Sequence, residues 1–161
     1  MKIVAMQPNH WPEVEKIYQD GIDTNQATFE TQTPTWETWD NGHLETARLV
    51  ALDENETVLG WAALSPVSKR HVYRGVAEVS IYIAMDQIGK GLGKALLTEL
   101  IQQSEDAGIW MLQAVTFPEN KASVHLHQSL GFRLVGHREK IAQQHGVWRN
   151  TVMLERRSEV I

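Results

Sequence analysis

The sequence predicts an α/β (α+β) fold: a mixed, mostly antiparallel central sheet of about six to seven strands with helices on both faces. Three observations support this prediction. The predicted elements follow the order β, α, short α, β, β, β, α, β, α, β, β, so strands and helices do not alternate regularly. Apolar runs joined by short turns predict antiparallel hairpins. One helical crossover between two strands predicts a parallel pair within the sheet.

The N-terminal part predicts a strand, a helix, a loop and a short helix. Lys2–Met6 is apolar enough for a strand. Pro8 then begins a helix that reaches about Ile22, because apolar residues recur on one face. The polar, threonine-rich segment Asp23–Thr35 predicts a loop, and Thr35–Asn41 predicts a short helix.

The middle of the chain predicts a hairpin followed by a strand–loop–helix unit. Arg48–Asp53 and Val58–Val67 are apolar runs separated by D-E-N-E, which is a hairpin signal. Ser68–Arg74 is a basic connection. Val76–Ala107 then contains a strand, a glycine-rich loop and an amphipathic helix.

The C-terminal part predicts a strand, a helix and two closing strands. Trp110–Phe117 is a further apolar run. Glu119–Leu130 follows as a helix, and Gly131 suits its C-terminal end. Phe132–Ile141 and Val147–Leu154 predict two strands around the turn Q-Q-H-G.

Length and composition favour one domain, residues 1–161, and exclude several classes of function. The net charge of −5 gives no bulk attraction to nucleic acid or to an anionic membrane. The chain has no cysteine, which excludes disulfides and a cysteine nucleophile, and no metal site is expected. No apolar run approaches the ~20 residues that cross a bilayer, and the N-terminus lacks the apolar segment of a signal peptide. A cytoplasmic location is therefore expected.

The glycine-rich loop predicts an anion site. It carries three alternating glycines and two lysines: Gly89, Gly91, Gly93, Lys90 and Lys94. Such a loop at the start of a helix directs several main-chain N–H groups to one point, and the positive end of the helix dipole adds to their attraction for an anion. Glu78 lies on the strand just before it. A phosphate-bearing cofactor beside a proton acceptor is the expected arrangement.

Two common phosphate motifs do not match this loop. A P-loop requires G-x-x-x-x-G-K-[ST], but Ala95 follows Lys94 and Ile88 occupies the first glycine position. A dinucleotide fingerprint requires G-x-G-x-x-G near the first βα turn, whereas this G-x-G-x-G lies in mid-chain. The pyrophosphate of coenzyme A is the third possibility, and a flexible turn without a ligand is the alternative.

Three segments together resemble the GNAT superfamily of N-acetyltransferases, over nearly the whole chain. They are the strand with Glu78, the loop Gln87–Gly93 and the segment Glu119–Phe132, which reads E-N-K-A-S-V-H-L-H-Q-S-L-G-F. The loop is similar to the family's Q/R-x-x-G-x-G/A, with Ile88 in place of the first Gln or Arg. The last segment is similar to N-x-x-S-x-x-x-Y/H-x-x-x-G-F.

The resemblance implies a GNAT-like fold and acetyl-CoA as the cofactor. The pantetheine arm of coenzyme A is expected to pair with the strand backbone, and the diphosphate to bind the loop, mainly through main-chain N–H groups and the lysines. The implied cofactor-binding residues are Ile81, Ile83, Ile88, Gly89, Lys90, Gly91, Leu92, Gly93, Lys94, Asn120 and Ser123.

A narrower resemblance points to the phosphinothricin and methionine sulfoximine acetyltransferases. It rests on I-Y-Q-D-G-I-D-T-N-Q-A-T-F-E-T, Y-R-G-V-A-E-V-S-I-Y-I and H-G-V-W-R-N-T-V-M-L. The chain has Val79 where that family often has histidine. The resemblance implies a small amino-acid-like acceptor, a homodimer, and an acceptor wall formed by Phe29, Glu30 and Thr31.

Glu78 is the candidate general base for acetyl transfer. Strand alternation places Glu78, Ser80 and Tyr82 on one face of their strand. An acid on a central strand is costly to bury without a partner or a catalytic role, and it would accept the amine's proton through a water molecule. The alternative is a structural acid paired with an arginine such as Arg74.

His127 is the candidate proton donor to the departing thiolate, because the resemblance places it where many family members have tyrosine. Tyr82 and water are the alternatives. Asn120 and Ser123 have the spacing of an ordinary helix N-cap, and the resemblance also places them beside the cofactor.

Arg74, with Tyr73, is the candidate clamp for an acceptor carboxylate, since a guanidinium binds carboxylate in a bidentate manner. The alternative is a solvated loop charge. Trp148 is expected to close the acceptor pocket or to pack at a dimer contact.

These observations predict an acetyl-CoA-dependent N-acetyltransferase that acts on the α-amino group of a small amino acid or analogue. Two rivals remain: an N-acetyltransferase of a peptide, protein N-terminus or polyamine, and a CoA-binding module without catalysis. The basic residues near the expected site disfavour a polyamine, which would require acidic loops.

Overall fold

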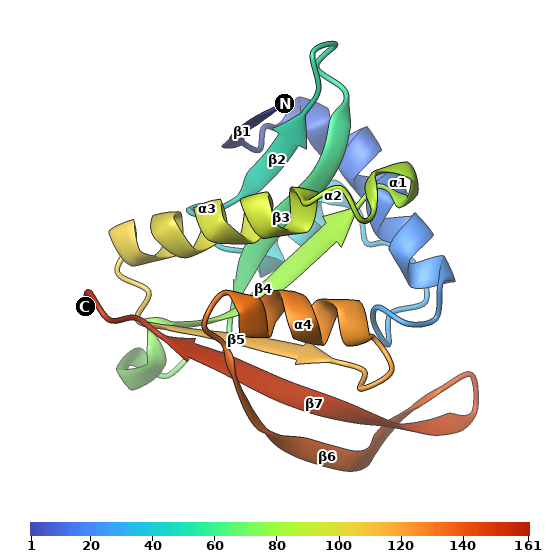
Figure 1. Ribbon diagram of the computed structural model, residues 1–161, viewed down its shortest axis with the longest axis vertical. Helices are drawn as coiled ribbons and strands as arrows, with labels where there is room; N and C mark the ends of the chain where they lie inside the picture. Colours follow the sequence, from blue (N-terminus) through green and yellow to red (C-terminus); the bar gives the residue numbers. More distant parts are fainter.

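One seven-stranded sheet runs through the molecule (Figure 1), in a computed structural model that describes residues 1–161. Its order is β1-β2-β3-β4-β5-β7-β6, and every neighbouring pair is antiparallel except the parallel pair β4–β5. The mostly antiparallel sheet predicted from the sequence is confirmed. The strands are β1 (Lys2–Ala5), β2 (Leu49–Leu52), β3 (Val58–Pro66), β4 (Val76–Ile83), β5 (Met111–Thr116), β6 (Arg133–Gln144) and β7 (Val147–Arg157).

Helices cover both faces of the sheet. On one face, α1 (Trp11–Asp23) and α2 (Trp36–Gly42) bury an aromatic cluster against β3. On the other face, α3 (Leu92–Asp106) and α4 (Lys121–Ser129) cover an aliphatic core (Figure 1). None of the helices combines the length and the apolar character needed to span a bilayer.

Strand β4 separates these two cores by simple alternation. Val79 belongs to the aliphatic core, and Ile81 and Ile83 pack against it. Tyr82 packs in the aromatic cluster, stacked on Trp61 with ring centroids 5.0 Å apart. The predicted faces of this strand are therefore confirmed, because side chains at successive positions point to opposite sides of a sheet.

The parallel pair β4–β5 is short, and this opens the sheet. Pairing covers only Val76–Glu78 with Met111–Gln113, whereas β4 pairs with β3 along the strand from Ala77 to Ile83. Beyond Glu78 the two strands diverge and leave one edge of β4 without a strand partner. Main-chain groups on that edge must find partners elsewhere, because unpaired backbone polar groups are costly to bury.

The C-terminal hairpin extends further than the sequence predicts. Strand β6 continues to Gln144 and β7 to Arg157, and only two residues with positive φ, His145 and Gly146, form the turn. A bulge explains why Ile141 looked like the end of the first strand: Lys140 has φ +49° and interrupts the alternation of side chains.

Candidate active site

The loop before α3 presents main-chain donors without partners. None of the N–H groups from Ile88 to Lys94 donates a main-chain or side-chain hydrogen bond that satisfies standard geometry within the protein. Gly89 and Gly91 both have φ +81°, a conformation that side chains other than glycine rarely adopt. The first turn of α3 contains no acidic residue. This loop therefore offers a cradle for an anion at the positive end of the helix.

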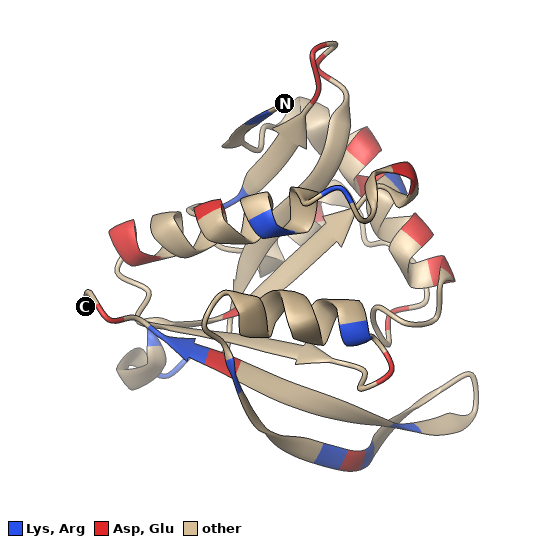
Figure 2. Ribbon diagram, in the orientation of Figure 1, with Lys and Arg blue, Asp and Glu red and all other residues tan.

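Two lysines without ion-pair partners lie in this loop and in the first turn of the helix. Lys90 and Lys94 are exposed, and neither takes part in an ion pair. Figure 2 shows basic residues at the start of α3 and in the loop before it. The residues predicted to hold a diphosphate, Ile88–Lys94, thus carry positive charge and unpaired donors together.

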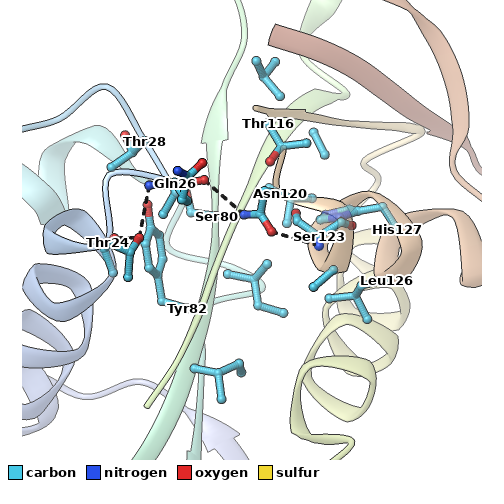
Figure 3. Close-up of a pocket in the computed structure, with 18 of the residues that line it drawn as sticks. Thr24, Gln26, Thr28, Ser80, Tyr82, Thr116, Asn120, Ser123, Leu126 and His127 are labelled. Carbon is cyan, nitrogen blue, oxygen red and sulfur yellow. Dashed lines mark hydrogen bonds between the residues drawn. The ribbon is translucent and has the colours of Figure 1, made fainter. Parts of the chain in front are cut away.

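A cleft of about 460 Å³ occupies the gap between β4 and β5. We call it the strand cleft; Figure 3 shows its polar side chains converging from β4, α4 and the loop after α1. Its lining includes seven of the residues predicted from the sequence as catalytic or cofactor-binding: Glu78, Ile81, Ile83, Ile88, Asn120, Ser123 and His127. Ile88 belongs both to this lining and to the loop Ile88–Lys94, which we call the glycine cradle.

A second cavity of about 420 Å³ lies beside the strand cleft. We call it the hairpin cavity, because Arg138 and Ile141 of β6 and Thr151 of β7 form one wall. Phe29 and Glu30, two of the predicted acceptor residues, lie in its lining as well. The two spaces share five lining residues: Ala27, Thr28, Glu78, Val115 and Thr116.

Glu78 lies where the two cavities meet. It is the last residue of β4 that pairs with β5, opposite Gln113, and its side chain is half-buried. The Gln113 amide donates a long hydrogen bond of 3.4 Å to Glu78 Oε1. No ion pair joins Glu78 to Arg74, so the structural alternative for this acid is not observed. The carboxylate thus borders both cavities and takes part in no ion pair.

Asn120 caps α4 and also ties it to the opposite wall of the strand cleft. Its Oδ1 accepts a hydrogen bond from Ser123 N at 3.2 Å, as the N-cap interpretation predicts. Its Nδ2 donates to the main-chain oxygen of Gln26 at 3.2 Å, in the loop after α1 (Figure 3). One side chain therefore fixes the distance across the mouth of the cleft.

His127 lines the strand cleft in a form that disfavours the role of proton donor. It is buried, and its Nδ1 lies 2.8 Å from the main-chain oxygen of Ser123, so Nδ1–H donates there. Burial lowers the pKa of His127 below its ordinary value of 6.5, which keeps the ring neutral near pH 7. Its Nε2 is buried without a partner. In this tautomer Nε2 is an acceptor and carries no proton to give.

Arg149 is a residue of the site that the sequence motifs did not reveal. Its guanidinium lies 3.6 Å from the ring centroid of Phe117 and donates to the main-chain oxygen of Asn25 at 2.5 Å. It also donates to side-chain oxygens of Gln26, Glu119 and Gln144. Arg149 thus joins the loop after α1, the loop before α4 and the C-terminal hairpin, which together surround both cavities.

Four residues predicted for the acceptor pocket lie outside the lining of both cavities: Thr31, Tyr73, Arg74 and Trp148. Arg74 is exposed, its guanidinium lies 5.3 Å from the ring centroid of Trp110, and it donates to the main-chain oxygen of His71. Arg74 therefore lies outside the lining of both cavities, and its guanidinium packs on Trp110 instead. Trp148 is 56% exposed on the hairpin, where it is available for another contact.

Comparison with known proteins places this geometry in a family. The model of the acetyltransferase (GNAT) family matches residues 11–132. The chain belongs to the GNAT family. It is accordingly an N-acetyltransferase, and acetyl-CoA is the cofactor of this family. The cradle of free N–H groups and the unpaired edge of β4 fit the diphosphate and the extended arm of that cofactor.

Relatives within the family act on amino acids. The chain is 31% identical over 150 residues to L-methionine sulfoximine/L-methionine sulfone acetyltransferase of Pseudomonas paraeruginosa, covering 89% of this chain and 87% of the relative. It is 31% identical over 156 residues to phosphinothricin N-acetyltransferase of Alcaligenes faecalis, covering 90% and 76%. The crystal structure of a phosphinothricin acetyltransferase from Sinorhizobium meliloti in complex with AcCoA superposes with a TM-score of 0.86 at 30% identity, covering 97% and 87%.

Proposed function

We propose that this GNAT enzyme transfers an acetyl group from acetyl-CoA to the α-amino group of a small amino acid or analogue, of the phosphinothricin or methionine sulfoximine type. The observation that carries the proposal is the position of Glu78, whose carboxylate lines both the strand cleft and the hairpin cavity. An acid at this junction can serve an amine that enters from one side and a thioester held on the other.

The strand cleft is the proposed cofactor site. The N–H groups of Ile88–Lys94 would hold the diphosphate, helped by Lys90 and Lys94. The free edge of β4 around Ile81 and Ile83 would hydrogen-bond the pantetheine arm as an added strand does, and Asn120 and Ser123 lie across the cleft from it. Acetyl-CoA supplies an acetyl thioester that is reactive toward amines.

Glu78 is the proposed general base. It would accept a proton from the acceptor's ammonium group through one water molecule, so that the neutral amine attacks directly. The chain has no cysteine that could carry the acetyl group in between. A main-chain N–H of the free edge near Ile81–Ile83 would donate to the developing oxyanion.

The proton for the departing sulfur is best assigned to water. His127 has its single N–H donated to Ser123, as described above. Burial raises the pKa of Tyr82, so its phenol keeps its proton. This assignment replaces the role expected of His127 with that of a hydrogen-bond acceptor in the wall of the cleft.

Two further features belong to the proposal. A homodimer is expected to form through the C-terminal hairpin, where Val147 and Trp148 are 63% and 56% exposed, and sedimentation at micromolar concentration tests it. A cytoplasmic location is expected from the sequence, and cell fractionation tests it.

A thiol-release assay tests the proposed function. Purified protein is supplied with acetyl-CoA and a panel of amino acids, methionine sulfoximine, phosphinothricin, a short peptide and spermidine. The proposal predicts thiol release with free amino acids or the two analogues, together with an N-acetylated product identified by mass spectrometry. Release only with the peptide or spermidine would replace the acceptor class. No release with any amine would contradict the proposal.

A further inference from the structure

One wall of the hairpin cavity has no role in the proposed acetyl transfer. Arg138 on β6 and Thr151 on β7 are directly paired in the antiparallel ladder, and both line the cavity. Side chains of directly paired residues project from the same face of a sheet. A guanidinium and a hydroxyl are thus presented together to the same space.

Neither group has a carboxylate or oxygen partner within the protein. Arg138 is exposed and takes part in no ion pair, and its guanidinium makes one long hydrogen bond, 3.9 Å to the Met153 sulfur. Thr151 is only 4% exposed, and its Oγ1 is buried without a hydrogen-bond partner. Buried hydroxyls are normally hydrogen-bonded, so Thr151 Oγ1 is a hydrogen-bonding group for which the protein itself supplies no partner.

The β6 bulge shapes this wall. The pairing register shifts between Arg138 and Ala142, and Lys140, with φ +49°, is held by a 2.8 Å hydrogen bond from its N–H to Asn150 Oδ1. A bulge bends its strand and redirects side chains. As a result Arg138, Ile141 and Ala142 all line the cavity, although regular alternation would place Arg138 and Ile141 on opposite faces.

The rest of the cavity lining contains acidic and aromatic side chains. Glu30 and Glu78 contribute the two carboxylates of the lining. Phe29 and Phe117 meet edge to face with ring centroids 4.9 Å apart. The hairpin cavity therefore offers acids for an ammonium group, a cation for an anion, and apolar surface between them.

We propose that Arg138 and Thr151 form the subsite for the α-carboxylate of the acceptor, so that the enzyme selects amines that carry a free carboxylate. This inference rests on the proposed function and names the recognition element within it. The Arg138 guanidinium binds the carboxylate oxygens in a bidentate manner, and Thr151 Oγ1 donates a further hydrogen bond. Arg138 takes the role that the sequence suggested for Arg74.

The test compares each accepted amino acid with its α-carboxamide, which keeps the amine and side chain but loses the negative charge. Thiol release is measured for the unaltered enzyme and for R138Q, T151V, T151S, R74Q and R133Q. R133Q is the matched control, because Arg133 lies on the same strand, is exposed and lines neither cavity. Coenzyme A affinity is measured for every variant to show that each is folded.

The unaltered enzyme is expected to prefer the acid over the amide. R138Q and T151V are expected to raise KM for the acid on the order of tenfold, as loss of a charge-assisted hydrogen bond implies, and to leave KM for the amide nearly unchanged. T151S keeps the hydroxyl and should restore most of the preference. R74Q and R133Q should behave like the unaltered enzyme.

Two other outcomes are distinguishable. Equal use of acid and amide, or an acid preference that survives in R138Q and T151V, would overturn the carboxylate subsite while leaving the amino-group acetyltransferase intact. An acid preference that disappears in R74Q alone would return the role to Arg74. If neither acids nor amides are acetylated, the proposed function fails, and the subsite fails with it.

Discussion

The proposed site has two halves, one proposed for the cofactor and one for the acceptor, and they are built in different ways. The cofactor half comes mostly from one continuous segment, Ile81–Lys94, and it offers mainly main-chain groups: the free edge of β4 and the N–H groups of the glycine loop. The acceptor half comes from the loop after α1, the ends of β4 and β5, and the C-terminal hairpin, and it offers side chains. Glu78 lies between them.

This difference separates what is general from what is specific. Main-chain recognition tolerates many side chains, because the donors are present at every non-proline residue, and it suits a cofactor whose diphosphate does not vary. Recognition of an acceptor depends on which charges meet in the hairpin cavity. Of the two binding functions, changes on the cofactor half should therefore affect coenzyme binding, and changes on the acceptor half should affect acceptor selectivity.

The largest effect on kcat is expected from a change of Glu78, which lies between the two halves. E78Q should lower kcat by about 100-fold or more, because a general base typically contributes that much, while the Kd for coenzyme A stays unchanged. Steady-state kinetics and equilibrium binding measure the two quantities. E54Q, at an exposed turn acid, serves as control. A large loss of coenzyme affinity in E78Q would show that Glu78 belongs to the cofactor half instead.

The glycine cradle gives the next largest effect. G91V should weaken coenzyme A binding about tenfold or more, because a β-branched residue is strained at φ +81° and distorts the converging N–H groups. G108V is a matched control: Gly108 has φ +82°, lies just beyond the opposite end of α3, and likewise has open space around it. Both variants should lose similar thermal stability. Equal coenzyme affinities in the two would contradict the cradle.

Arg149 tests how the acceptor half is held. R149Q should raise KM for the acceptor severalfold and lower the free energy of unfolding by about 1–3 kcal/mol, because the buried side chain of Gln144 loses a charged donor. The Kd for coenzyme A should change much less. R133Q, which breaks an exposed ion pair with Glu155, is expected to cost under about 1 kcal/mol. An unchanged acceptor KM in R149Q would remove its positioning role.

The smallest effect is expected on the pH dependence of the free energy of unfolding, to which His127 contributes. Burial holds the pKa of His127 below 6.5 in the folded protein, so the unfolded chain binds its proton at higher pH than the folded one. The free energy of unfolding should therefore fall as the pH drops below about 6.5, and H127Q should flatten this slope without abolishing it, because burial also lowers the pKa of His43. Denaturant unfolding across this pH range measures it. Identical slopes would show that His127 does not titrate in this way.

The strand, loop and helix of the proposed cofactor half could be predicted from the sequence, for a physical reason. A glycine loop that begins a helix and a strand with one acid are local patterns, and Gly89, Gly91 and Glu78 occupy the expected positions in the fold. The sheet class and the helices on both faces followed from periodicity in the same way.

The acceptor half depends on contacts that local patterns do not contain. Arg149 donates a hydrogen bond to Asn25, which is 124 positions away in the sequence, and no local motif predicts this contact. Arg74 is close to Glu78 in sequence, yet its side chain turns to Trp110. Arg138 enters the cavity beside a bulge whose positive φ at Lys140 interrupts the strand pattern. Closeness in sequence to Glu78 does not bring Arg74 into either cavity lining, and Arg149 and Arg138 are far in sequence from the residues they meet.

The most direct test is a crystal structure with coenzyme A and an accepted amino acid bound together. The account predicts the pantetheine arm between β4 and β5, the diphosphate within hydrogen-bond distance of the N–H groups of Ile88–Lys94, and the amino nitrogen linked to Glu78 directly or through one water molecule. A gap left empty between these strands while the coenzyme binds elsewhere, or an amine held away from Glu78, would contradict it.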